Sequence, residues 1–82
     1  MSVIKSLVQS FLKAKTADEM ENLLLGLLTT KEAEEFGKRI EIIKLLKQGV
    51  AQHKVAEKLG VGVATVSRGA QELKLKRFKV IS

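Results

Sequence analysis

Residues 52–68 read QHKVAEKLGVGVATVSR, a stretch with the spacing of two short helices joined by a tight turn. Two helices that cross at about 90–120° need a small residue where their backbones approach, and Ala56 is placed to be that residue. The turn needs a residue that tolerates positive φ, and Gly60 does so without steric cost. The residues spaced to form a small shared core are Val55, Leu59, Val61 and Val66. The stretch therefore predicts a helix-turn-helix with helices over 52–58 and 63–73.

The outer face of the second helix in this pair carries small, hydroxyl-bearing and basic side chains. Small side chains allow close approach to the major groove, methyl groups meet thymine, and hydroxyl groups reach phosphates or base edges. The N-terminus of the first helix suits a phosphate group. We therefore predict DNA contacts from Gln52, His53, Lys54, Val63, Ala64, Thr65, Ser67 and Lys74. The alternative is a helical hairpin that serves only for packing.

Charge is distributed unevenly along the 82 residues, whose net charge is +6. Residues 1–37 sum to −2, whereas residues 38–82 sum to +8. This asymmetry indicates an anionic partner for the C-terminal part, and both nucleic acid and a membrane surface are anionic. Basic residues that only increase solubility are the remaining interpretation. If the partner is DNA, we expect phosphate contacts from Lys38, Lys54, Lys58, Lys74 and the tail.

Apolar residues before this motif recur with helical spacing almost throughout. One stripe of a predicted first helix consists of Val3, Leu7 and Phe11. Thr16 and Glu19 form a capping box that starts a second helix. Residues 23–28 are apolar on nearly every side of that helix, so they need cover on nearly every side. In so short a chain, a second subunit is the expected cover.

A third helix is predicted to begin after Thr29 or Thr30 and to end at Gly49. With the pair over residues 52–73, the chain is predicted to be all-α, with five or six short helices. We assign residues 1–49 to dimerisation and core, 50–74 to the helix-turn-helix and 75–82 to a basic tail, all within one structural domain.

A chain of 82 residues without cysteine has no disulfide or thiolate metal site to stabilise it. Because domains this short are marginally stable alone, oligomerisation is the common remedy, and we expect a homodimer. No segment approaches the roughly 20 apolar residues that span a bilayer, and the N-terminus lacks the apolar centre of a signal peptide. These observations predict a cytoplasmic protein with no membrane partner.

The residues that commonly carry catalysis or hold metals are sparse. His53 is the single histidine, so a metal site is not predicted. Glu34 and Glu35 point about 100° apart on a helix, which suits a charged first turn and not an acid–base pair. No phosphate-binding glycine loop or nucleophile motif occurs. The chain is predicted not to be an enzyme.

Five stretches of the sequence resemble the tryptophan-operon repressor family. They are Leu27–Thr29, Phe36–Arg39, Ile42–Leu46, Ala64–Gly69 and Leu73–Lys74, and the run ATVSRG at 64–69 is the most specific. The resemblance implies an intertwined dimer in which the N-terminal helices of each subunit embrace the other subunit. It also implies L-tryptophan as corepressor, which fixes the angle between the two helix-turn-helix units of the dimer.

The same resemblance implies a ligand site. Arg39 and Arg68 match the two guanidinium groups that sandwich an indole ring, a contact that arginine makes well. Backbone oxygens beside the ammonium group would come from Gly26, Leu28 and Thr29. The slot would be lined by Ile43 and Gly69. Arg68 has a competing role, because in a generic helix-turn-helix it would face DNA.

Two features depart from the family pattern. Glu72 stands where the pocket usually has a serine, and a carboxylate there attracts the ammonium group of an amino acid but repels its carboxylate. The segment between Arg39 and Gln52 is one residue shorter than in the best-known members, which leaves the distance between Arg39 and Arg68 open. The tail is also short of the family's last helix.

Together these observations predict a sequence-specific DNA-binding transcriptional repressor of the Trp-repressor type, associated with the bacterial nucleoid. It would act as a homodimer on a palindromic operator in double-stranded DNA, with successive major grooves about 34 Å apart. No cofactor is required, and L-tryptophan or another small ligand gates binding. Two alternatives remain: a protein–protein module of the transcription machinery using the same helix pair, and a membrane-surface protein using the first helix and the basic tail.

Overall fold

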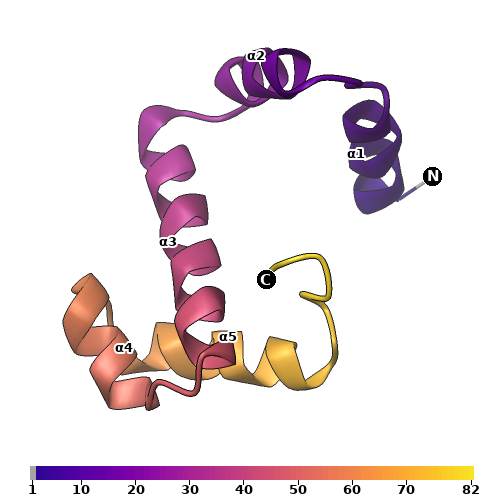
Figure 1. Ribbon diagram of the computed structural model, residues 1–82. Helices are drawn as coiled ribbons and strands as arrows, with labels where there is room; N and C mark the ends of the chain where they lie inside the picture. Colours follow the sequence, from indigo (N-terminus) through magenta and orange to yellow (C-terminus); the bar gives the residue numbers. More distant parts are fainter. Residues whose placement is uncertain (1) are drawn as a thin grey trace. The chain divides into compact units, whose positions relative to one another are not determined.

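The computed structural model describes residues 2–82, and over that range the chain forms five α-helices and no strand (Figure 1). The helices are α1 (Val3–Leu12), α2 (Ala17–Leu27), α3 (Thr30–Lys47), α4 (Gln52–Leu59) and α5 (Val63–Lys74). Residues 75–80 follow α5 as turns. The all-α prediction is confirmed, and α4 and α5 each extend one residue beyond their predicted ends.

The first three helices begin at hydroxyl-bearing residues that cap exposed backbone N–H groups. Each of these side chains accepts a hydrogen bond at 3.1 Å from the backbone N–H three residues later, and the caps are Ser2, Thr16 and Thr29. At α3 the contact is reciprocal, because the N–H of Thr29 donates to the carboxylate of Glu32 at 2.9 Å. This is a capping box. The caps predicted at Thr16 and Thr29 are confirmed.

Left-handed glycines end α3 and α4. Gly49 has φ 86° and Gly60 has φ 65°, a region that residues with a Cβ atom rarely adopt. Past Gly49, the N–H of Val50 donates to the carbonyl of Leu45 at 3.1 Å, which closes the Schellman turn typical of helix ends. The same closure follows α4. The predictions that Gly49 ends the third helix and that Gly60 makes the interhelical turn are confirmed.

The core lies where α3, α4 and α5 meet. Its buried side chains are Ile42, Ile43, Val55, Ala56 and Val66. Partly buried apolar side chains surround them: Leu45, Leu46, Val50, Leu59, Val61, Leu73, Phe78 and Ile81. All four residues predicted to form the small shared core of the helix-turn-helix are in these two groups. The residues of α3 and the tail enlarge that core beyond the prediction.

The chain divides into two compact units, Met1–Ala33 and Glu34–Ser82, and the boundary falls inside α3. All members of the core cluster belong to the second unit. In contrast, neither α1 nor α2 has a buried residue. The functional division proposed at residues 49/50 is a different one, and it stays a prediction.

The first unit exposes much apolar surface. Its exposed large apolar side chains are Val3, Ile4, Leu7, Val8, Leu12, Leu25 and Leu27, with Leu25 72% exposed. In the predicted stripe of α1, Val3 and Leu7 are therefore exposed, whereas Phe11 is half-buried. No helix in residues 2–82 has the length and apolar character needed to cross a bilayer.

Candidate nucleic-acid interface and ligand cleft

The crossing of α4 and α5 determines which side chains face outward. Val55 and Ala56 of α4 and Val66 of α5 are buried at the crossing, so the two helices approach closely. Figure 1 shows both helices at the C-terminal end of α3. Between them, the left-handed Gly60 reverses the chain within three residues. This is the arrangement of a helix-turn-helix.

The first two turns of α5 present an open surface, which we call the reading face. Its members are Val63, Ala64, Thr65 and Arg68, all exposed. Val63 is 54% exposed although it is β-branched and apolar. No side chain on this face is acidic, so nothing on it repels a phosphate backbone. The residue types and their exposure match the sequence prediction.

Ser67 differs from the other predicted contacts. It is half-buried, and its hydroxyl group donates a 2.8 Å hydrogen bond to the side-chain oxygen of Gln52. This bond joins the two helices of the motif on the side next to the reading face. Because its oxygen accepts from Ser67, the amide of Gln52 has its NH₂ group left to donate outward. Ser67 therefore orients Gln52 and does not lie on the open face.

The N-termini of α4 and α5 lack side-chain caps, unlike those of the first three helices. Their N-cap residues are Ala51 and Gly62, and neither makes a side-chain hydrogen bond. The first backbone N–H groups of these two helices therefore remain available, at the positive ends of the helix dipoles. Both ends belong to the helix-turn-helix, where a DNA backbone would pass.

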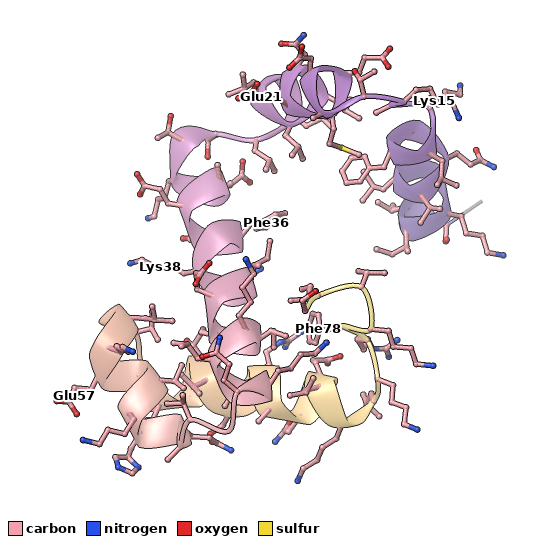
Figure 2. The ribbon with its side chains drawn as sticks, in the orientation of Figure 1. Lys15, Glu21, Phe36, Lys38, Glu57 and Phe78 are labelled. Carbon is pink, nitrogen blue, oxygen red and sulfur yellow. The ribbon has the colours of Figure 1, made fainter. Side chains whose placement is uncertain are left out.

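Exposed basic side chains accompany these ends. The predicted phosphate contacts Lys38, Lys54, Lys58 and Lys74 are exposed, and so is His53. Within residues 2–82 the ion pairs are Lys44–Glu41 and Arg77–Glu72. The four predicted lysine contacts are therefore not neutralised by a carboxylate, whereas Arg77 of the tail is. Figure 2 shows Lys38 and Glu57 pointing outward from α3 and α4.

A cleft of about 720 Å³ lies between α3, α5 and the tail, and we call it the α3–α5 cleft. Its lining residues are Arg39, Ile42, Ile43, Ala64, Thr65, Arg68, Gly69, Glu72 and Phe78. Both arginines of the predicted ligand site are therefore on one cleft, despite the shortened segment after Arg39. The volume is within the range of small-molecule sites, about 300–1,000 Å³. Ala64, Thr65 and Arg68 belong to the cleft and to the reading face.

Arg39 is held by an aromatic neighbour on its own helix. Its guanidinium carbon lies 5.6 Å from the centre of the Phe36 ring, three residues earlier, which is within the range of a cation–π contact. Such a contact restricts a long, flexible side chain to one side of α3. The sequence analysis named Phe36 only as part of the family resemblance and did not assign it this role.

Gly69 of α5 lies close to two isoleucines of α3. A Cβ atom at this position would lie 3.2 Å from Cγ2 of Ile42 and 3.4 Å from Cδ1 of Ile43. The helices can be this close because residue 69 has no side chain. Gly69 and Ile43, both predicted to line the ligand site, are therefore packed against each other at the base of the cleft.

Glu72 is paired with the tail. Its carboxylate accepts a hydrogen bond from Nε of Arg77 at 2.9 Å, and its side chain is 31% exposed. Phe78, the next residue, contributes to the same cleft and to the apolar core. Figure 2 shows Phe78 on the tail, turned back toward α3. The sequence predicted only phosphate contacts from the basic tail as a whole and gave Arg77 and Phe78 no individual role. The one signal for Phe78 was an apolar residue within a basic tail.

Thr29 lies in the other compact unit, and the structure gives it the capping role at α3 described above. The backbone N–H and hydroxyl of Thr29 hold the pKa of the Glu32 carboxyl group below its ordinary value. A ligand contact from Thr29 stays a prediction. Residues 2–82 contain no group of three metal-ligating side chains.

Comparison with protein families gives a match to the Trp repressor protein family over residues 2–80. The chain is a Trp repressor family protein. The family is regulatory and not enzymatic, as predicted from the lack of catalytic motifs. The resemblance noted at ATVSRG and the flanking stretches is thereby confirmed.

Relatives named Trp operon repressor homolog occur in several Vibrio species. The chain is 46% identical over 55 residues to one from Vibrio vulnificus, which covers 66% of this chain and 54% of the relative. Identity is 36% over 73 residues for Vibrio parahaemolyticus and 38% over 77 residues for Vibrio atlanticus. Those matches cover 88% and 93% of this chain and 71% of each relative. No solved structure matches the chain.

Proposed function

We propose that this Trp-repressor-type regulator is a sequence-specific DNA-binding protein that represses transcription as a homodimer on a palindromic operator. An aromatic amino acid, L-tryptophan, acts as its corepressor from the α3–α5 cleft. Its place of action is the bacterial cytoplasm, at the nucleoid. The observation that carries the proposal is the reading face, an exposed and acid-free surface on the second helix of a helix-turn-helix.

The α3–α5 cleft supports ligand gating because it shares residues with the reading face. Ala64 and Thr65 line the cleft and also lie on the first turn of α5. A ligand in the cleft therefore contacts the helix that enters the major groove. Such a ligand favours DNA binding to the extent that it binds the DNA-competent position of α5 more tightly than other positions.

The homodimer follows from the uncovered apolar surface of α1 and α2. Seven large apolar side chains of the first unit are exposed, as listed under the fold. Exposed apolar surface beyond scattered single residues is typical of interfaces in soluble proteins. A second copy of the chain offers equivalent helices, and a two-fold dimer places two reading heads on the two halves of a palindrome.

DNA binding is tested by selecting duplexes from a random pool with the purified chain and then measuring affinity across a salt series. Val63→Asp is the decisive variant. An acidic residue at the first position of α5 favours the helix dipole, so the fold is retained, but it faces the phosphates. We expect at least tenfold weaker DNA binding with an unchanged melting temperature. Wild-type protein that binds no duplex even at low salt would contradict the proposal.

The predicted contacts between lysines and DNA phosphates are tested separately. Lys54→Ala should reduce the slope of log K against log salt by about one, because one phosphate contact is lost. Lys13→Ala is the matched control, an exposed lysine on the turn after α1 and outside the predicted contacts. The control should leave the slope unchanged. Equal effects of the two variants would show that only net charge matters.

Ligand binding is tested by calorimetric titration with L-tryptophan up to millimolar concentration. Arg68→Ala and Arg39→Ala should each remove most of the signal, because guanidinium groups stack on aromatic rings and pair with carboxylates. Absence of both heat and thermal shift for the wild type would rule out L-tryptophan as corepressor. DNA binding is measured independently and would survive that result.

A further inference from the structure

The tail after α5 is fixed against the second unit by several contacts. Arg77 pairs with Glu72 at 2.9 Å. The amino group of Lys47, at the end of α3, donates to the backbone carbonyls of Phe78 and Ile81. Both of these tail residues also pack on the apolar core. The tail is therefore a structural part of the helix-turn-helix unit (Figure 1).

This docking brings Phe78 to the cleft. Its ring lines the cleft together with Arg39 and Arg68, and about 720 Å³ of open space remains with the ring in place. Phe78 therefore borders the cleft and does not fill it. An aromatic wall beside two guanidinium groups suits a flat aromatic ligand, because ring–ring contacts add to the stacking of arginine.

The ion pair between Arg77 and Glu72 changes the charge that Glu72 presents to a ligand. A free carboxylate in the cleft would repel the carboxylate of an amino acid ligand. With Arg77 hydrogen-bonded to Glu72, this charge is compensated and the guanidinium groups of Arg39 and Arg68 leave the cleft net positive. The glutamate is thus compatible with an anionic group on the ligand as long as the tail is docked.

We propose that the tail completes the ligand site: Phe78 is its aromatic wall, and Arg77 neutralises Glu72 so that the cleft accepts an aromatic α-amino acid. This inference rests on the proposed function, in which the cleft binds such a ligand. Phe78 would contact the ligand, and Arg77 would determine which ligand charge the cleft accepts; both residues follow the last helix.

The wall is tested by titrating L-tryptophan into wild type, Phe78→Leu and Val80→Ala. Phe78→Leu keeps apolar volume against the core but loses the ring, so affinity should fall about three- to tenfold. Val80 is 94% exposed on the same tail, and its alanine variant should bind as wild type does. Helix content and melting temperature verify that the variants are folded. Unchanged or tighter binding of L-tryptophan by Phe78→Leu would contradict a ligand contact from the Phe78 ring.

The charge role is tested with two ligands. Arg77→Ala should weaken L-tryptophan about three- to fivefold but should not weaken tryptamine, which lacks the carboxylate. Lys79→Ala is the matched control. It removes a positive charge from the tail at a residue that does not line the cleft. In a Glu72→Ser background, Arg77→Ala should have no effect on L-tryptophan. Equal loss for both ligands would overturn the neutralising role.

Failure of the proposed function looks different from failure of this inference. If wild type binds no L-tryptophan, the corepressor proposal falls and this inference falls with it. If wild type binds and the Phe78 and Arg77 variants bind equally well, the corepressor proposal stands and the tail has no part in the site.

Discussion

The turn that ends α5 has the same form as those that end α3 and α4, but a lysine occupies its left-handed position. Lys76 has φ 60°, the one positive φ outside glycine in residues 2–82. Its N–H donates to the carbonyl of Leu73 at 2.9 Å, and the N–H of Arg77 donates to the carbonyl of Glu72 at 3.4 Å. A residue with a Cβ atom in this conformation costs about 1–2 kcal/mol. The ion pair between Glu72 and Arg77 spans the same turn and opposes that cost.

Lys76→Gly should therefore stabilise the chain by about 0.5–1 kcal/mol, because glycine adopts positive φ without the steric penalty but loses more entropy on folding. Urea unfolding followed by circular dichroism measures the change. Lys74→Gly is the control within α5, and it should destabilise by about 1 kcal/mol. A loss of stability on Lys76→Gly would show that the turn is not left-handed.

The hydrogen bond between Ser67 and Gln52 predicts coupled effects on DNA affinity. Ser67→Ala frees the Gln52 side chain to rotate, and Gln52→Ala removes it, so each should weaken DNA binding about three- to tenfold. The double variant should be little worse than the single ones, because both act on one group. Affinities measured at constant salt form the cycle. Fully additive effects would mean that Ser67 contacts DNA independently of Gln52.

Among the elements, α3 begins with a capping box that holds the carboxyl group of Glu32 against Thr29. The backbone N–H of Thr29, and then its side chain, lower the pKa of Glu32. Because the folded-state pKa lies below the unfolded one, the ionised cap stabilises the fold at neutral pH. This stabilisation is lost as the pH falls below the ordinary glutamate pKa of 4.5 and through the lowered value.

Glu32→Gln keeps a hydrogen-bond acceptor at the cap but removes the charge. We expect a lower melting temperature than wild type at pH 7 and a difference that shrinks toward zero in acid. Glu35→Gln, an exposed charge on the same helix and outside the capping box, is the control. A difference between wild type and Glu32→Gln that stays constant with pH would contradict a role for the ionised carboxylate.

The elements were largely predictable because their signals are local. The caps at Thr16 and Thr29 bond to the backbone only three residues later. The turns at Gly49 and Gly60 each depend on one glycine with positive φ. The tail was not predictable. Its anchor joins Lys47 to carbonyls more than thirty residues later, and its left-handed residue is a lysine, which gives no sequence signal.

The lining of the α3–α5 cleft was predictable where the family resemblance names single positions, and its use by a ligand stays a prediction. Arg39, Arg68, Ile43, Gly69 and Glu72 all line one cleft, and the reading face was found from residue size and spacing. The hydrogen bond of Ser67 to Gln52 was not predictable, since a hydroxyl group on α5 is equally compatible with a DNA contact and with a hydrogen bond inside the protein. Sequence alone also gave no reason to place the tail beside Glu72.

At the scale of the whole molecule, the bare apolar surface of the first unit predicts that stability depends on protein concentration. Wild type should sediment as a dimer, and its melting temperature should rise with concentration. Leu25→Asp should shift the chain toward monomer and raise the dimer dissociation constant about a hundredfold or more, because the symmetric contact loses two buried leucines. Glu21→Gln, a polar change on the same helix, should sediment as wild type does.

Within the described residues 2–82, every fully buried side chain lies between residues 42 and 66. Contacts so close along the sequence form early during folding, before any encounter between copies. In the proposed repressor, the reading face is consequently shaped by its own short segment, and the exposed apolar surface of the first unit is left to select the partner chain. On that proposal, substitutions in the first unit would alter the choice of dimer partner and leave the operator preference untouched.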